Sequence, residues 1–270
     1  MNMNKTPEFI IIGAMKSGTS TIDRNLIVHS QIGFTVTKEP NFFSNNFNKG
    51  FDWYLNQFPS DKPILGETSP NYSRLHLYPE TVRNMKQFNP DMKIIYIVRD
   101  PIDRIVSHLH HNIYRDRLNS KSVEKELIGN EDYILTSSYF FQIKPYLETF
   151  DSRNIKVVLF EDFIKNPTAI LKDLCNFLNA EYEEIHFKAY NISSKKYLIK
   201  FHDTFHKLFG NNKFTDLYHL FWYFMSIKID RPILTEKSKL FIKSNIKEDI
   251  AKFQTIFSLD SSKWNTYEKI

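Results

Sequence analysis

The sequence predicts an α/β protein: a central parallel β-sheet flanked by helices on both faces, followed by a helical C-terminal portion. Short, nearly continuous apolar runs alternate along the chain with longer stretches of helical spacing, which is typical of parallel strands covered on both faces. The chain has 270 residues, 41% of them hydrophobic, enough for a substantial core. We therefore expect a single domain over residues 1–270, with the core sheet at about 8–180 and the helical part at about 197–270.

The predicted strands are the apolar runs, and each stops at residues that turn the chain. The first run, Phe9–Ile12, leads into Gly13, and the third precedes Ser69 and Pro70. The run at 93–98 is rich in β-branched residues, which favour strands. We expect strands at 9–14, 32–36, 64–67, 93–98 and 156–160.

Helices are expected where apolar residues recur at helical spacing. Pro101 suits the first position of the helix that follows the strand at 93–98. The expected helices are 21–29, 79–88, 102–114, 139–150, 168–178, 201–209, 217–227 and 235–257. In the last of these we expect one buried face, formed by Leu240, Ile246, Ile250, Phe253 and Phe257. The single cysteine, Cys175, lies in the apolar pattern of 168–178 and is expected to be a core residue.

The turn between the first strand and the first helix is the most informative segment. It reads Gly13-Ala14-Met15-Lys16-Ser17-Gly18-Thr19-Ser20. A tight turn into a helix directs backbone N–H groups and the positive helix end at one point, which suits a phosphate or sulfate. A nucleotide triphosphate loop carries its lysine after the second glycine, where this chain has Thr19. Because Lys16 lies inside the loop and no clear strand ends in a lone acidic residue, a kinase is the weaker alternative.

Two segments resemble signatures of the sulfotransferases that use 3′-phosphoadenosine 5′-phosphosulfate (PAPS). The run Lys16-Ser17-Gly18-Thr19-Ser20-Thr21 is similar to their 5′-phosphosulfate loop, and Arg99 with Ser107 is similar to their 3′-phosphate site. The resemblance implies a P-loop NTPase-like sulfotransferase fold, with PAPS as co-substrate and adenosine 3′,5′-bisphosphate (PAP) as product. It also implies that residues 16–21, Arg99 and Ser107 bind this cofactor. Arginine suits such a site because its planar fork of donors matches phosphate oxygens.

A third segment resembles the heparan sulfate N- and O-sulfotransferase branch. KEPNFF at 38–43 and KGFDWY at 49–54 are similar to that branch's K-E-x-x-F-F and K-G-x-x-W-Y segment. The resemblance implies that Glu39 is the general base on the acceptor hydroxyl or amine. It implies that Lys16 stabilises the charge developing on the leaving phosphate. It also implies that His111, four residues after Ser107, is catalytic or contacts the acceptor.

Three further residues are weaker candidates. Lys195 and Lys196 occupy the place of the family's late phosphate loop, although the glycine of that loop is missing. Either lysine is expected to contact the cofactor, with two solvated surface lysines as the alternative. Glu67 is a second acidic candidate on the acceptor side.

The expected activity is transfer of a sulfuryl group from PAPS to a hydroxyl or amine acceptor, by resemblance a carbohydrate. The transfer is expected to be a single in-line displacement without a metal. A small-molecule or nucleotide kinase and a non-catalytic anion-binding protein of the same fold are the alternatives. Lys and Tyr side chains of the loop 112–138 and of the helical tail are expected to shape the acceptor cleft.

Charge and composition bear on partners and location. The net charge of +5 suits an anionic cofactor but is too small to indicate nucleic acid. One cysteine permits no intrachain disulfide, which is compatible with a reducing compartment. No apolar run has the length of a membrane span. We therefore expect a cytoplasmic protein without a membrane span, and the sequence does not fix its oligomeric state.

Overall fold

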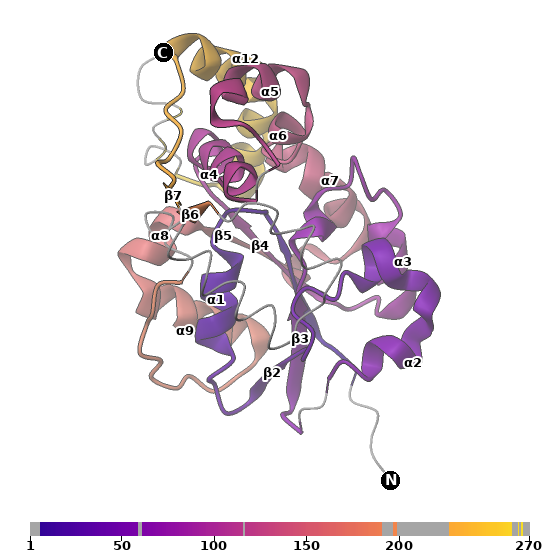
Figure 1. Ribbon diagram of the computed structural model, residues 1–270. Helices are drawn as coiled ribbons and strands as arrows, with labels where there is room; N and C mark the ends of the chain where they lie inside the picture. The colour runs from indigo at the N-terminus through magenta and orange to yellow at the C-terminus, as the bar shows by residue number, and fades with distance from the viewer. Residues whose placement is uncertain are drawn as a thin grey trace, which may run out of the picture.

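The structure is a computed structural model that describes residues 6–58, 61–115, 117–190, 197–198, 227–260, 264 and 266. A five-stranded sheet lies at its centre, in the order β2-β3-β1-β4-β5, and all neighbouring strands are parallel (Figure 1). The strands are β1 (Phe9–Gly13), β2 (Ile32–Phe34), β3 (Ile64–Thr68), β4 (Lys93–Val98) and β5 (Ile155–Leu159). The predicted fold class is confirmed, and each predicted strand overlaps an observed one.

Helices cover the sheet and form the described C-terminal part. The α-helices are α1 (Thr19–Leu26), α2 (Gly50–Leu55), α3 (Thr81–Phe88), α4 (Pro101–Tyr114), α5 (Val123–Gly129), α6 (Asp132–Leu135), α7 (Tyr139–Thr149), α8 (Phe160–Lys165), α9 (Pro167–Leu178) and α12 (Glu236–Phe257). Short helical turns are η1 (Phe42–Asn46), η2 (Phe47–Lys49), η3 (Pro70–Ser73), η4 (Ser120–Ser122) and η5 (Ser152–Asn154). A small antiparallel pair, β6 (Tyr197–Leu198) and β7 (Ile227–Lys228), completes the described elements.

Alternate residues of the strands serve two separate cores, because side chains of a strand point to opposite faces. Phe9 and Ile11 pack in one apolar cluster with residues of α1 and α9. Ile10 and Ile12 pack in the other, with residues of α3, α4, α7 and α12. Figure 1 shows the same layering, with α1, α8 and α9 on one side of the sheet and α2, α3 and α7 on the other. The buried, continuously apolar β1 is therefore sandwiched between helices.

Two expectations differ from the structure, and a third lies outside the described residues. Leu240 was expected on the buried face of α12, but its side chain is 65% exposed, and the buried positions are Ile242, Ile246, Ile250 and Phe253. The spacing of four, four and three residues marks the true helix phase. The segment 112–138, expected as a loop, contains α5 and α6. The helices expected at 201–209 and at most of 217–227 lie outside the described residues.

The topology places the functional candidates at one edge of the sheet. β1 lies between β3 and β4, so the chain moves to one side of β1 first and to the other side later. Open parallel sheets bind ligands beyond the carboxyl ends of their strands at such a reversal. The loops that leave β1, β3 and β4 therefore converge on the predicted anion site.

Candidate functional site

The loop between β1 and α1 is held by the strand beside it. The N–H of Ala14 donates to the carbonyl of Ile97 in β4 at 2.6 Å, and the N–H of Ser17 donates to the carbonyl of Ala14 at 3.1 Å. Gly18 precedes α1 with φ of 91°, a conformation that favours glycine. The first N–H groups of α1 have no acceptor within the helix. The loop therefore presents backbone donors at the positive end of α1.

Lys16 itself has an unusual backbone. Its φ is 70°, in the left-handed region that costs a residue with a side chain roughly 1–2 kcal/mol. Glu39, the residue predicted to be the general base, has φ of 52°. Such conformations gather at functional sites, where the surrounding structure holds them. Both predicted residues therefore lie at strained positions of the backbone.

Arg99 lies at the end of β4, beside the loop. Its guanidinium lies 4.8 Å from the centre of the Phe160 ring, and its Nη2 is 3.5 Å from Oδ2 of Asp103. The side chain is 17% exposed. The hydroxyl of Tyr139 donates to the carbonyl of Arg99 at 2.6 Å, which fixes the strand end.

Phe160 connects the two predicted cofactor segments. A Cβ added to Gly18 would lie 2.5 Å from Cδ2 and Cε2 of the Phe160 ring, so the loop packs directly against the ring that stacks on Arg99. The structure therefore brings the Lys16 loop and Arg99 together around one aromatic side chain. No motif in the sequence pointed to Phe160, although its position directly after β5 puts it at the same edge as the ends of β1 and β4.

Two buried polar atoms at this edge fit an anionic cofactor. The Oγ of Ser17 and the Nε of Arg99 are buried and have no hydrogen-bond partner among the described residues. A buried donor without a partner destabilises a fold by roughly 1–3 kcal/mol. Phosphate or sulfate oxygens would supply the missing acceptors. The residues present therefore fit a phosphorylated ligand between the loop and Arg99.

A buried arginine supports the loop from behind. Arg104 is fully buried. It donates from Nη1 to the carbonyl of Met15 at 3.3 Å, from Nη2 to the carbonyl of Tyr133 at 2.8 Å and from Nε to Oγ of Ser137 at 2.5 Å. Within the described residues no ion pair joins it to a carboxylate. Its positive charge therefore stands behind the anion loop, a role that spacing alone could not show.

The remaining residues of α4 are less closely connected to the loop. Ser107 is buried, with 8% of its surface exposed, so it is not a surface hydroxyl. His111 is partly exposed, and its ring centre is 6.3 Å from that of Tyr114. Pro101 and His111 are about 15 Å apart along the helix axis, at 1.5 Å per residue. His111 therefore lies toward the end of α4 that is remote from Arg99.

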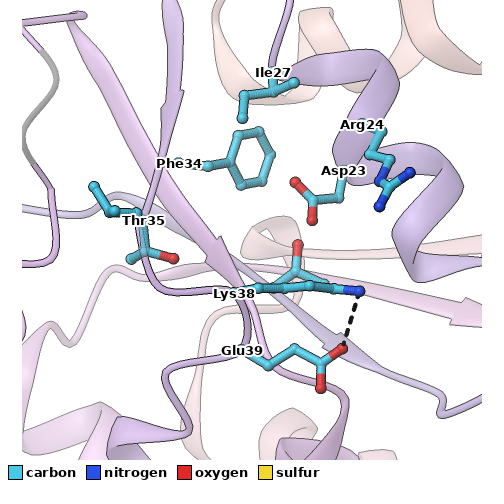
Figure 2. Close-up of a pocket in the computed structure, with 9 residues that line it drawn as sticks. Asp23, Arg24, Ile27, Phe34, Thr35, Lys38 and Glu39 are labelled. Carbon is cyan, nitrogen blue, oxygen red and sulfur yellow. Dashed lines mark ion pairs between the residues drawn. The ribbon is translucent and has the colours of Figure 1, made fainter. Parts of the chain in front are cut away.

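Glu39 lies in the turn that follows β2. Its Oε1 is 4.0 Å from Nζ of Lys38, and its side chain is 40% exposed. Figure 2 shows both residues at a cavity whose opposite wall is formed by Asp23 and Arg24 of α1. A carboxylate at the wall of a cavity can reach the proton of a bound hydroxyl or amine.

A buried glutamate holds the turn that carries Glu39. Glu67 of β3 is fully buried, and Oη of Tyr54 and Oη of Tyr72 both donate to its Oε1 at 2.8 Å. The Oγ of Ser69 donates to its Oε2 at 2.7 Å and accepts from the N–H of Asn41 at 3.1 Å. Burial raises the pKa of Glu67 to about 7. Glu67 therefore braces the Glu39 turn rather than facing the cavity.

The remaining predictions concern two lysines, a metal, a membrane span and the single cysteine. Lys195 and Lys196 lie outside them. In the parts of the chain that the structure describes, no group of three or more His, Cys, Asp or Glu is arranged to hold a metal ion. No helix in those parts is long and apolar enough to cross a bilayer. Cys175 is buried, as expected.

The fold and site define an α/β protein with a glycine-bounded strand–helix loop, suited to an anion, at the switch point of a parallel sheet. The chain belongs to the sulfotransferase family, because a family model described as a sulfotransferase domain matches residues 6–207. A crystal structure of a sulfotransferase from Alicyclobacillus acidocaldarius has a TM-score of 0.70 and 24% identity. The match covers 96% of this chain and 98% of the Alicyclobacillus chain. It supports the fold.

Curated relatives give the same family. The membrane-associated sulfotransferase kil1 of Dictyostelium discoideum is 33% identical over 112 residues, 40% of this chain and 23% of that protein. The human heparan sulfate glucosamine 3-O-sulfotransferase 3B1 is 29% identical over 182 residues, 64% of this chain and 46% of that protein. The chain thus matches less than half the length of either relative.

Proposed function

We propose that the chain transfers a sulfuryl group from PAPS to a hydroxyl or amine of a carbohydrate by a single in-line displacement. The observation that carries the proposal is the contact of Phe160 with both Gly18 and Arg99, which joins the two cationic segments. A ligand with phosphate groups at both ends of an adenosine suits two such segments. The heparan sulfate relative supports a carbohydrate acceptor.

The proposal gives each residue a role. PAPS supplies an activated sulfuryl group. The loop 16–21 binds the 5′ end through backbone N–H groups and hydroxyls, and Arg99 with Ser107 binds the 3′-phosphate. Lys16 donates to the phosphate oxygen that leaves, and Glu39 accepts the proton of the attacking hydroxyl or amine.

Two secondary expectations follow from the same reasoning. Lys195 or Lys196 contacts the cofactor, and His111 contacts the acceptor. Transfer requires no metal, because Lys16 and the helix end stabilise the departing charge. The cytoplasmic location and the single-domain organisation remain predictions from the sequence.

A general-base substitution tests the proposed activity. Glu39→Gln keeps the shape of the side chain but cannot accept the proton. We expect kcat on a glycan acceptor to fall by roughly 10²–10⁴-fold, with PAP affinity within about twofold of wild type. The matched control is Glu80→Gln, because Glu80 is exposed at the start of α3. Unchanged turnover in Glu39→Gln would show that Glu39 is not the base.

A further inference from the structure

The cavity beside Glu39 has two chemically different walls. Its charged side is formed by Asp23, Arg24, Lys38 and Glu39, whereas Ile27 and Phe34 contribute apolar surface. In Figure 2 the carboxylate of Asp23 points from α1 toward the side chain of Lys38, and Glu39 lies beyond it. Polar groups facing an apolar wall suit a sugar ring, which has hydroxyls on its edge and C–H groups on its faces.

The two cations at this cavity already have partners. Nζ of Lys38 lies 4.0 Å from Oε1 of Glu39. The guanidinium of Arg24 lies 4.8 Å from the centre of the Tyr190 ring. Both contacts lie at the surface, where cation–π pairs and ion pairs are worth about 1 kcal/mol or less. Each cation at the cavity thus has a partner of its own, and both also act on Asp23 through space.

Asp23 is different, because its carboxylate has no such partner. Among the described residues, no hydrogen bond or ion pair reaches it, although it is only partly exposed. Burial raises the pKa of Asp23 to about 6, and the nearby charges of Lys38 and Arg24 oppose that rise. At neutral pH the group is therefore mainly ionised and lacks donors.

Thr68 provides a second polar group without a partner. It lies at the end of β3, lines the same cavity and is 4% exposed. Its Oγ1 is buried and has no hydrogen-bond partner among the described residues. Buried polar groups of native proteins are nearly always hydrogen-bonded. A carboxylate and a hydroxyl that both lack partners indicate a polar ligand.

We propose that this cavity, lined by Asp23, Thr68 and Glu39, binds the acceptor sugar through its hydroxyl or amino donors, and that Asp23 selects against a sulfated sugar there. The inference rests on the proposed function and names the substrate class of the same site. A hydroxyl or ammonium group supplies the donor that the Asp23 carboxylate lacks. A sulfate group has no proton to donate at neutral pH and would be repelled by both carboxylates.

Steady-state kinetics of the purified chain with PAPS and three acceptors tests this inference. The acceptors are a maltooligosaccharide, a chitosan oligosaccharide and heparan sulfate, which are neutral, amino and sulfated glycans. We expect wild type to have a higher kcat/KM on at least one of the first two than on heparan sulfate. Asp23→Asn keeps the side-chain volume and removes the charge.

In Asp23→Asn we expect KM for the preferred acceptor to rise about tenfold, as for loss of a hydrogen bond to a charged group. The KM for PAPS should stay within twofold, and the kcat/KM ratio of heparan sulfate to the preferred acceptor should rise. The control is Asp91→Asn, an exposed aspartate before β4 at the opposite edge of the sheet. The inference is overturned, and the proposed function is not, if wild type prefers heparan sulfate. The same holds if Asp23→Asn leaves the kcat/KM ratio of heparan sulfate to the preferred acceptor unchanged. No transfer to any of these glycans overturns the proposed function, and the inference falls with it.

Discussion

Gly18→Ala tests the contact that joins the two cationic segments. Gly18 has φ of 91°, and an added Cβ would lie 2.5 Å from Cδ2 and Cε2 of Phe160. Real Cβ atoms do not approach a ring so closely, so the loop or the ring must move. The Phe160 ring also contacts the guanidinium of Arg99 at 4.8 Å from its centre. A methyl group on the loop therefore disturbs the Arg99 site as well.

Backbone strain and overpacking both lower the stability of Gly18→Ala. Alanine in the left-handed region costs roughly 1–2 kcal/mol, and overpacking costs roughly 1–3 kcal/mol. The free energy of unfolding should therefore fall by about 2–5 kcal/mol. Relaxation of Phe160 also weakens its contact with Arg99, which is worth about 0.5–2 kcal/mol. Because about 1.4 kcal/mol is tenfold in affinity, a loss of this size should raise the Kd for PAP by roughly 2–30-fold.

The assays are urea unfolding and calorimetric titration with PAP in the presence of EDTA. The matched control is Gly50→Ala. Gly50 also has a positive φ, of 81°, but nothing lies within 4 Å of an added Cβ. The control carries backbone strain without a clash, and it should bind PAP as wild type does. The reasoning is refuted if folded Gly18→Ala binds PAP with an affinity equal to that of Gly50→Ala.

Two further predictions concern the supports of the site. Burial raises the pKa of Glu67 from 4.5 to about 7, so between these pH values the folded state binds one proton more than the unfolded state. The free energy of unfolding should therefore fall by about 3 kcal/mol as the pH rises through this range. The difference in unfolding free energy between wild type and Glu67→Gln should show this loss from pH 5 to 8, and parallel curves would contradict it. Arg104→Met leaves the carbonyls of Met15 and Tyr133 without their arginine donor, so the unfolding free energy should fall by about 2–6 kcal/mol and PAP affinity should weaken. Urea unfolding and titration measure both, and an unaltered PAP Kd would show that Arg104 does not support the loop.

Local patterns were sufficient for the fold and for the position of the glycine-bounded loop between β1 and α1. The apolar runs and the glycine-bounded turn report interactions between near neighbours in sequence, and parallel strands bring their carboxyl ends to one edge. Arg99 and the Lys16 loop could therefore be expected to meet. For Leu240 the prediction was wrong because a long amphipathic pattern admits more than one helix phase, and packing against α7 and the sheet core selects Ile242 instead.

The supports of the site could not be read from the sequence. The contact of Phe160 with Gly18 and Arg99 depends on how β5 lies beside β4. Glu67 appeared as a second acidic candidate, but its hydrogen bonds to Tyr54 of α2 and Tyr72 of η3 form only when these elements pack together. The exposed or buried state of Asp23 likewise depends on the turn after β2. Each of these features requires tertiary structure.

Titration of the chain with PAP in EDTA is the most direct test of the central claim, that the Lys16 loop and Arg99 bind one doubly phosphorylated adenosine. We predict that PAP binds without a metal, that its binding weakens at least tenfold in Lys16→Met and in Arg99→Met, and that ATP with Mg²⁺ binds more weakly than PAP. The account is contradicted if PAP does not bind, or if ATP with Mg²⁺ binds more tightly than PAP.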